Sequence, residues 1–387
     1  MPDIELGEYL QSVPVVDNHC HAVQTRQQND AEGFRAYFTE SPDPSMRATD
    51  AGESAYYRRL LRRMAAFHGV PATEDAVLAA RASLTAEQLV AGYLPQANVG
   101  GLVIDTGFPT PDTALDDGVF DAASGAQRVT LLRLEVEFQR LVAEHHRYDD
   151  LVDAVRASLA DVRGRGFAGL KSIVGYRTGL AVERWTDDDA RASFAAARDE
   201  AARTGAVRLG HKPLLDTLLH TAFEAAAGQE LPLQFHVGYG DPDADLRRAA
   251  PLELRAVLEE PAYRSMPVVL LHGCWPYVRE GAYLASVYPN AWLDLSYGIP
   301  FLSMAEMRSM TRAAFGVVPF SKVMYSSDGG RVPEIHWMSA HDGRQVIGEV
   351  LGELVADGDL DEAEARGAGE RVLRDNAAAL YGVDVPR

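Results

Sequence analysis

Two histidines separated by a single residue are the side chains of this sequence best suited to bind a metal ion. His19 and His21 end an apolar run that begins at Val13. If this run is a β-strand, alternate side chains share one face, so both imidazoles point the same way while Cys20 points away. Imidazole nitrogen is a common ligand of zinc and of other divalent ions. The pair therefore predicts one half of a metal site.

Other polar residues with metal-binding or acid–base chemistry end later apolar runs. They are Lys171, His236, His272 and Asp328. Each has an ordinary alternative role: a helix cap for Asp328, a core histidine for His272, and a lysine that reaches solvent for Lys171. Burying all of them without a purpose would be costly, so their conjunction favours a functional site.

From these residues we expect a centre for a divalent ion, with zinc as the first candidate. A catalytic zinc takes about three protein ligands and keeps a position open for water. His19, His21 and His236 supply three nitrogens, and Asp328 is either a further ligand or the base that orients the water.

The elements that would position these residues are short apolar segments with helical stretches between them. Several segments are apolar almost throughout, as in parallel strands that are buried on both faces. We predict strands at Val13–His19, Gly101–Thr106, Val129–Glu135, Phe167–Ile173, Leu231–Val237, Pro267–Gly273, Ala291–Ser296 and Lys322–Asp328. Helical spacing is found at Leu151–Ala160, Asp187–Thr204 and Pro251–Leu258. Eight such units predict an α/β fold, a (β/α)8 TIM barrel formed by residues 1–387 as one domain.

One connection is too long for a simple barrel loop. Residues 25–99 separate the first two predicted strands and include the helical stretch Glu53–His68, which carries Arg58, Arg59, Arg62 and Arg63. Because catalytic residues of such barrels lie at the C-terminal ends of strands, we expect this insertion to form a helical lid there. For each arginine taken singly, a solvated helical face is the favoured interpretation. Residues 361–380 are predicted to form one or two closing helices.

Composition limits the partners of the chain. The net charge of −19 and the pI near 5.0 argue against nucleic acid and anionic membranes as partners, and leave a small-molecule substrate. No apolar stretch reaches the roughly 18–20 residues of a membrane span, and the first residues lack the features of a signal peptide. With only Cys20 and Cys274, a reducing cytoplasm and a packing role for both thiols are expected. Apolar residues and tyrosines in 271–300 would serve either the core or a contact in a homo-oligomer.

Several segments around these residues resemble one known family. They are Leu170–Leu180, Gln234–Gly238, Leu271–Glu280, Tyr283–Asn290 and Tyr325–Gly329. They look like the amidohydrolase-2 branch of the amidohydrolase superfamily, and most like the amidohydrolase half of nodulin/FluG-type fusions with glutamine synthetase. No glutamine-synthetase part is present in the sequence, so a stand-alone form is expected.

The resemblance implies a metal-dependent hydrolase of amides or other C–N bonds, with a γ-glutamyl amide as a candidate substrate. It implies that His19, His21 and His236 hold the metal, that Asp328 is ligand and proton acceptor, and that His272 polarises the substrate carbonyl or binds a second ion. Lys171 would be carboxylated and bridge two metals, or would bind a substrate carboxylate as an ammonium.

The predicted substrate-binding residues are Arg177, Tyr176 and Arg133. The planar fork of Arg177 suits a carboxylate, although a salt bridge in its loop is nearly as reasonable. Arg133 and Glu135 present the same choice between the site and an internal ion pair. The alternative function is a metal-dependent non-oxidative decarboxylase, which relatives in the same branch perform with a similar ligand set; a metal-free binding module is the least favoured interpretation.

Overall fold

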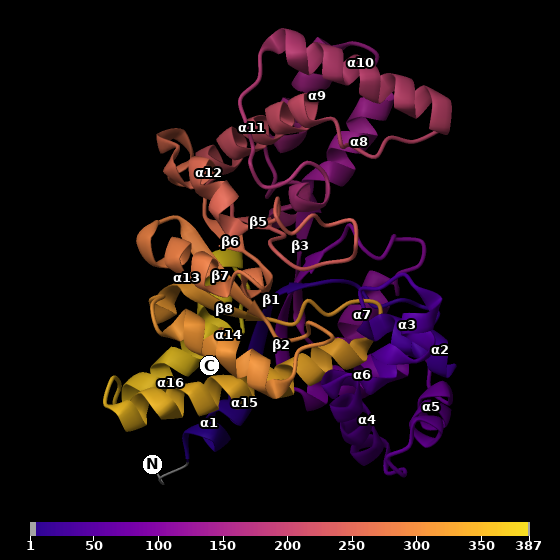
Figure 1. Cartoon of the computed structure of the whole chain (residues 1–387), viewed down its shortest axis with the longest axis vertical. Coiled ribbons are helices and arrows are strands. Elements are labelled where there is room, and N and C mark those ends of the chain that lie inside the picture. The colour runs from indigo at the N-terminus through magenta and orange to yellow at the C-terminus, as the bar shows by residue number, and fades with distance from the viewer. Residues whose placement is uncertain (1–4, 386–387) are drawn as a thin grey trace. The chain divides into compact units, whose positions relative to one another are not determined.

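The fold is an eight-stranded (β/α)8 or TIM barrel, as the sequence predicted. A computed structural model describes residues 5–385 of the chain, and within them eight parallel strands form one sheet in the order β1 to β8. Several helices lie between β1 and β2 (Figure 1). The strands are β1 Val15–Cys20, β2 Val99–Asp105, β3 Gln127–Arg133, β4 Phe167–Ser172, β5 Leu233–Phe235, β6 Val268–Leu270, β7 Ala291–Ser296 and β8 Val323–Ser326.

The predicted strands are confirmed in number and place, but most of them end earlier than expected. His272 and Asp328 lie beyond the last residues of β6 and β8, and their φ angles are +63° and +50°. Such left-handed backbone cannot continue a strand. Glu135 was expected at the end of a strand, and this is wrong: it lies in the first turn of helix α8 (Leu134–Glu144).

The described chain divides into two compact units. The first contains residues up to Val129, Gly240–Pro242 and residues from Asp294 onward; the second contains Thr130–Tyr239 and Asp243–Leu293. Helices of the first unit are α1 Leu6–Ser12, α2 Ala31–Arg35, α3 Pro44–Ala48, α4 Ala55–His68, α5 Glu74–Ala82, α6 Ala86–Gln96, α7 Asp117–Ser124, α14 Met304–Phe315, α15 Pro333–Asp357, α16 Glu362–Glu370 and α17 Asn376–Tyr381. The prediction of one domain stays a prediction.

In the first unit, β1 is buried along its whole length and pairs in parallel with β2. On the side of β1 away from β2 lies β8, and the Asp328 N–H donates to the His19 carbonyl at 3.0 Å. This bond joins the C-terminal ends of the two strands, which are the ends where barrel enzymes place their chemistry.

The insertion between β1 and β2 forms helices α2 to α6 and has its own aromatic core. Phe34 and Phe38 pack edge to face with ring centres 5.0 Å apart, and Tyr57 lies against both rings. Helix α4 begins at the N-cap Ser54, whose side chain accepts from the Tyr57 N–H, and ends at Gly69 in the left-handed region. Thus the helices predicted at 25–99 are present; their role as a lid stays a prediction.

The arginines of α4 do not share one environment. Arg59 and Arg63 both pair with the buried carboxylate of Asp342 on α15, at 2.8 and 2.9 Å. Arg58 and Arg62 are exposed. The solvated-face interpretation is therefore wrong for Arg59 and Arg63, because their guanidinium groups compensate a buried charge.

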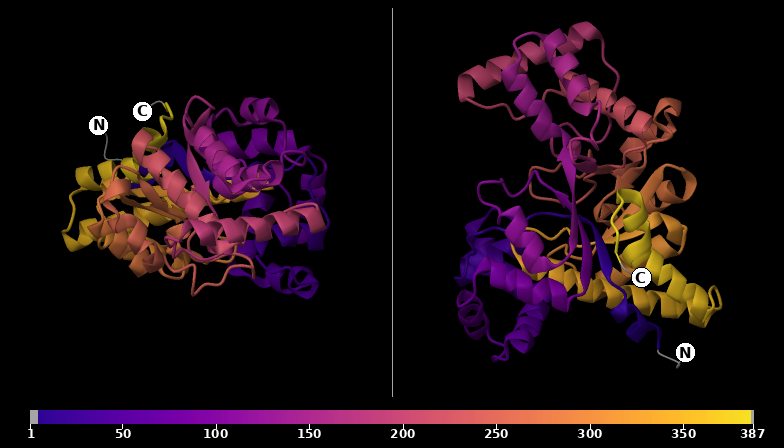
Figure 2. Two further views of the ribbon diagram at one scale, coloured as in Figure 1. Left: turned by 90° about the horizontal axis from the view of Figure 1, so that it is seen from above. Right: turned by 180° about the vertical axis from the view of Figure 1, so that it is seen from behind.

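The second unit holds strands β4 to β6, which pair in parallel, and a group of helices that lie side by side. The helices are α8 Leu134–Glu144, α9 Tyr148–Leu159, α10 Asp187–Thr204, α11 Lys212–Gln229, α12 Arg255–Glu259 and α13 Val278–Val287. Figure 2 shows α8 to α11, in purple to salmon pink, packed against one another. Helix α10 has the bounds that the sequence predicted and begins with a capping box of Thr186 and Asp189.

None of the helices in residues 5–385 is both long and apolar enough to pass through a membrane.

Candidate metal centre

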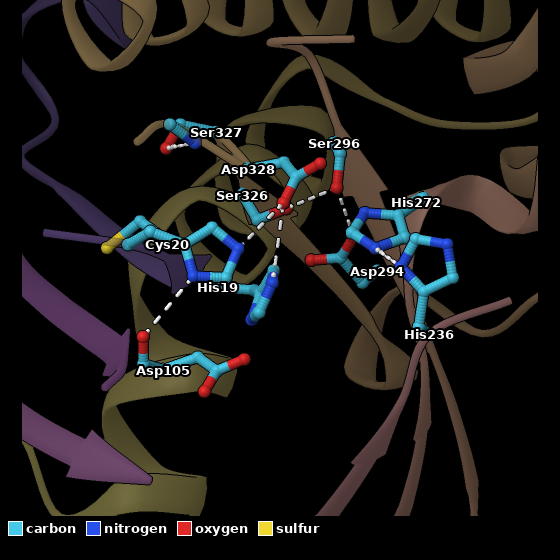
Figure 3. Close-up of polar contacts among 12 residues, drawn as sticks. His19, Cys20, Asp105, His236, His272, Asp294, Ser296, Ser326, Ser327 and Asp328 are labelled. Carbon is cyan, nitrogen blue, oxygen red and sulfur yellow. Dashed lines mark hydrogen bonds and ion pairs between the residues drawn. The ribbon is translucent and has the colours of Figure 1, made fainter. Parts of the chain in front are cut away.

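Three of the predicted ligands meet in the first unit. The Nε2 atoms of His19 and His21 lie 3.4 and 3.6 Å from the same Oδ1 of Asp328. Figure 3 shows His19 and Asp328 in this cluster. His19 is fully buried at the end of β1, and the two imidazole rings are nearly perpendicular, with centres 4.9 Å apart. Two nitrogens and one carboxylate oxygen therefore converge on one point.

These separations suit a shared ion. Two ligands that each lie about 2.0–2.2 Å from a tetrahedral zinc are roughly 3.4 Å from one another. The distances of 3.4 and 3.6 Å to Asp328 agree with that spacing and exceed those of a normal hydrogen bond. The donor set fits a divalent ion that accepts nitrogen and oxygen ligands.

The neighbour of His21 fixes which of its nitrogens can bind an ion. Its Nδ1 lies 3.3 Å from the backbone carbonyl of Asp105, which can only accept a hydrogen bond. The proton therefore sits on Nδ1, and the lone pair sits on Nε2, which faces Asp328. Metal-binding histidines commonly donate their other N–H to a carbonyl or carboxylate in this way.

The carboxylate of Asp105 belongs to the same cluster. Asp105 ends β2 and is fully buried, and one ligand atom from each of His19, His21 and Asp105 lies within 4.8 Å of the others. The sequence analysis missed this residue. Its signal was the one used elsewhere, a single acid at the end of an apolar run, here Leu102–Ile104.

A buried network holds the segment that carries Asp328. The carboxylate of Asp17, on β1, accepts the Ser327 backbone N–H at 2.8 Å and the Ser327 hydroxyl as well. The hydroxyl in turn accepts the Gly329 N–H at 2.8 Å, and His336 Nδ1 lies 3.7 Å from Asp17. Since all these groups are buried, their bonds resist any shift of Asp328 from its position.

The two glycines after Asp328 allow this close packing. A Cβ at Gly329 would lie 2.7 Å from the ring of His336, and one at Gly330 would lie 2.8 Å from the Cβ of His21. Side chains at either position would therefore displace a ligand or the network behind it. Asp328 itself has left-handed backbone, a conformation that costs of order 1 kcal/mol or more and concentrates at functional sites.

The surroundings of Cys20 favour its neutral thiol. It is buried and free of any disulfide. Burial raises the pKa of its thiol well above the usual value, and the nearby carboxylates of Asp17, Asp328 and Asp105 raise it further. The packing interpretation of Cys20 is therefore favoured, and Cys274 is likewise buried and free.

A second pair of predicted residues meets in the second unit. His272 Nε2 and His236 Nδ1 lie 2.9 Å apart, and His236 Nε2 also donates to the carbonyl of Tyr239. The acceptor role of that carbonyl puts the proton of His236 on Nε2, so Nδ1 accepts from His272. Both nitrogens of His236 thus have protein partners, and to bind a metal His236 would exchange one of them.

The remaining predicted residues surround the ends of β4 and β5. Lys171 is 1% exposed on β4 and is in register with Arg133 on β3 and Gln234 on β5. The ring of Tyr176 lies 4.4 Å from that of His236, centre to centre. These contacts bring Tyr176 to His236 and Lys171 to Arg133.

Arg177 and Glu135 differ in whether their buried polar atoms have hydrogen-bond partners. Glu135 is buried and accepts from the Ser172 hydroxyl at 2.7 Å and the Ile173 N–H at 3.0 Å, so it orders the loop after β4. Burial raises the pKa of the Glu135 carboxyl group and outweighs these hydrogen bonds, which lower it. Arg177 keeps a buried Nε without a hydrogen-bond partner, and burial, with Arg208 second, lowers its pKa. No ion pair of Arg177 occurs within residues 5–385, so the salt-bridge alternative is not supported.

Comparison with known proteins agrees with this description. A family model, Amidohydro_2 (amidohydrolase), matches residues 149–383. Protein fluG of Emericella nidulans is 34% identical over 221 residues, which cover 55% of this chain and 25% of that protein. The chain thus spans about a quarter of the length of this curated relative. The resemblance seen in the sequence motifs is confirmed.

Solved structures give the same fold over nearly the whole chain. A "putative metal-dependent hydrolase" from Lactobacillus casei ATCC 334 superposes with a TM-score of 0.87 at 27% identity, covering 98% of this chain and 97% of that one. Uronate isomerase from Thermotoga maritima superposes with a TM-score of 0.68 at 16% identity, covering 97% and 96%. The second likeness is evidence of the fold alone.

Proposed function

The chain belongs to the amidohydrolase family, and on this premise we propose that it hydrolyses an amide or another C–N bond in a small carboxylate-bearing substrate. One observation carries the proposal: His19 and His21 both direct Nε2 at one carboxylate oxygen of Asp328, at the spacing of ligands on a shared ion. The tautomer of His21, held by the Asp105 carbonyl, supports the same reading.

The proposed ion is divalent, with zinc as the first candidate. His19, His21 and Asp328 would hold it from the first unit, and His236 would add a nitrogen from the second. A divalent ion held in this way lowers the pKa of a coordinated water toward about 7 and polarises a carbonyl oxygen.

The protein's own groups manage the protons and the substrate. Asp328 accepts a proton from the attacking water, whose oxygen bonds to the carbonyl carbon. The C–N bond then breaks, and Asp328 returns the proton to the departing amine. His272 would exchange its hydrogen bond to His236 for one to the carbonyl oxygen, where negative charge develops.

Substrate selection is assigned to the basic residues after β3 and β4. Arg177, with its unpartnered buried Nε, binds a substrate carboxylate together with Arg133, and Tyr176 forms a wall of the site. The likeness to amidohydrolase halves fused to glutamine synthetase makes a γ-glutamyl amide the first candidate.

Lys171 decides between one ion and two in this proposal. Lys171 is 1% exposed, and only the neutral form of a lysine amine takes up CO2 to become a bridging carbamate. A carbamate supports a two-metal hydrolase, whereas an ammonium would bind a substrate carboxylate.

The test is a substrate screen on zinc-loaded protein with three products followed separately. γ-Glutamyl amides and aryl carboxylates are supplied, and ammonia, amine and CO2 are measured. Release of ammonia or amine from a γ-glutamyl amide, lost after chelation and restored by zinc, is the expected result. Release of CO2 alone would show a decarboxylase instead, and full activity of metal-free protein would contradict the mechanism.

A further inference from the structure

Arg331 lies close to the candidate metal centre and has no part in the roles assigned so far. It follows Asp328 by three residues, and its backbone is fixed on both sides: its N–H donates to the Ala22 carbonyl at 2.9 Å, and its carbonyl accepts the Gln24 N–H at 2.8 Å. Its φ of +64° is unusual for a long side chain. A strained backbone held this firmly near a functional site suggests that the side chain has a purpose there.

The guanidinium of Arg331 is held between two aromatic rings. Its central carbon lies 5.2 Å from the ring centre of Tyr37 and 5.7 Å from that of Phe108. Phe108 in turn packs edge to face on His21, with ring centres 5.6 Å apart. The positive charge of Arg331 is therefore one aromatic ring away from a proposed metal ligand.

Arg331 is half-buried, and its guanidinium makes no hydrogen bond or ion pair with any residue in 5–385. This separates it from other buried and half-buried arginines of the first unit. Arg81 pairs with Glu334 at 2.5 Å, and Arg344 donates to the carbonyls of Val13, Ala97 and Asn98. Arg59 pairs with Asp342 at 2.8 Å. A guanidinium has five N–H donors, and removing them from water without acceptors is costly. Cation–π contacts orient the group but leave these donors for a ligand.

The charged groups around Arg331 leave its charge without a direct counterion. Burial lowers its pKa, while Glu40 raises it and Arg47 lowers it. Burial raises the pKa of Glu40 to about 7, with the charge of Asp328 second. Glu40 thus interacts with Arg331 electrostatically but makes no ion pair with it. Arg47 adds positive charge nearby.

We propose that Arg331, clamped by Tyr37 and Phe108, binds a carboxylate of the substrate through its N–H fork, as a contact additional to the one assigned to Arg177 and Arg133. The inference rests on the proposed function of the adjacent centre and specifies the substrate class: a small molecule with a carboxylate a few carbon atoms from the bond that is cleaved. A bidentate bond to carboxylate is the interaction that a guanidinium forms best.

The test measures binding of glutarate, a carboxylate probe that cannot be hydrolysed, to zinc-loaded protein by calorimetry. We expect Arg331→Met to raise the Kd about 10- to 100-fold, the loss of a charged hydrogen-bonded pair. Arg331→Lys keeps the positive charge but lacks the planar fork, so its Kd for glutarate is expected to lie between those of wild type and Arg331→Met. The neutral analogue glutaramide is expected to bind weakly and equally to all variants.

Two controls keep the result specific. Arg62→Met removes an exposed arginine of the same insertion and is expected to leave the Kd of glutarate unchanged. Thermal melting and zinc content show whether Arg331→Met still folds and holds its metal. If it does not, the Kd of glutarate for Arg331→Lys is compared with that of wild type instead. Equal affinity of wild type and the Arg331 variant for glutarate, or no binding to wild type, would overturn the inference. If γ-glutamyl amides are not cleaved but glutarate binding depends on Arg331, the proposed reaction fails and the carboxylate site stands.

Discussion

His19 and His21 in the first unit face one carboxylate across 3.4 and 3.6 Å, whereas His236 and His272 in the second unit are joined by a hydrogen bond of 2.9 Å. In the first case the donor atoms lie at the spacing of ligands around an ion. In the second, each histidine already has a protein partner. The difference supports the proposal that His19, His21 and Asp328 hold the metal.

The supports of the two pairs also differ. Behind Asp328 stands the buried network of Asp17, Ser327 and His336, while the loop after β4 rests on the carboxylate of Glu135 alone among the groups described above. Buried networks transmit the loss of one member to the others. Removing a group behind Asp328 should therefore lower the affinity for metal, whereas removing the Glu135 carboxylate should not.

The largest effect is expected from Asp328→Asn. The amide keeps the size of the side chain but cannot accept the proton of water, so kcat should fall about 10²- to 10⁴-fold, the usual contribution of a general base. Steady-state kinetics with a melting curve would check this. Asp359→Asn, at an exposed acid, is the matched control; turnover near that of wild type in Asp328→Asn would remove this residue from the role of base.

A smaller effect is expected from Ser327→Ala. This change leaves the Gly329 N–H without its acceptor and removes a donor from Asp17. Affinity for zinc, measured by competition with a chelator, should fall about 10- to 100-fold, as when other partners behind metal ligands are removed. The exposed Ser309→Ala should retain wild-type affinity, and a Ser327 variant that does the same would show that the network does not position Asp328.

Glu135→Gln probes the corresponding support in the second unit. The amide can still accept one hydrogen bond but not both at full strength, so stability should fall by about 1 kcal/mol. Urea unfolding measures this change. Zinc affinity should not change, and a loss equal to that of Ser327→Ala would erase the distinction between the units.

The smallest expected effect concerns pH. Burial lowers the pKa of His341 on α15 to about 4, with Arg63 and Arg344 as further causes. Between its ordinary value of 6.5 and 4, the unfolded chain takes up a proton that the folded chain does not, so stability falls as the pH falls through this window. His341→Gln should flatten the decline of unfolding free energy by about 1 kcal/mol, a figure reduced for its partial exposure.

His220 in the second unit provides the comparison for that experiment. Burial, with Arg184 second, lowers its pKa as well, but no comparably large shift occurs there. His220→Gln should therefore change the pH curve less than His341→Gln. The reverse order would mean that acid acts first on the second unit.

The sequence predicted the barrel, and it singled out candidate ligands such as His19 and His21, because both depend on local patterns. Alternation places His19 and His21 on one face of β1, and apolar runs that end in a polar residue mark the C-terminal ends of strands. Asp105 carried the same signal and was overlooked.

Other features depend on contacts between distant parts of the chain. Nothing near Arg59 in the sequence indicates that Asp342, far along the chain, will be its partner. Nor does the sequence around Arg331 reveal that Tyr37 and Phe108 will enclose its guanidinium. Such pairs are set by tertiary packing, which no local pattern encodes.

The central claim is that the first unit holds the metal, and the most direct test is metal content by elemental analysis after exhaustive dialysis. Wild type should retain a divalent ion, and the double variant His19→Ala, His21→Ala should retain none while keeping its fold. His272→Ala should keep at least one ion per chain. Retention of the full metal content by the His19, His21 double variant, or a metal-free wild type that is active, would contradict the account.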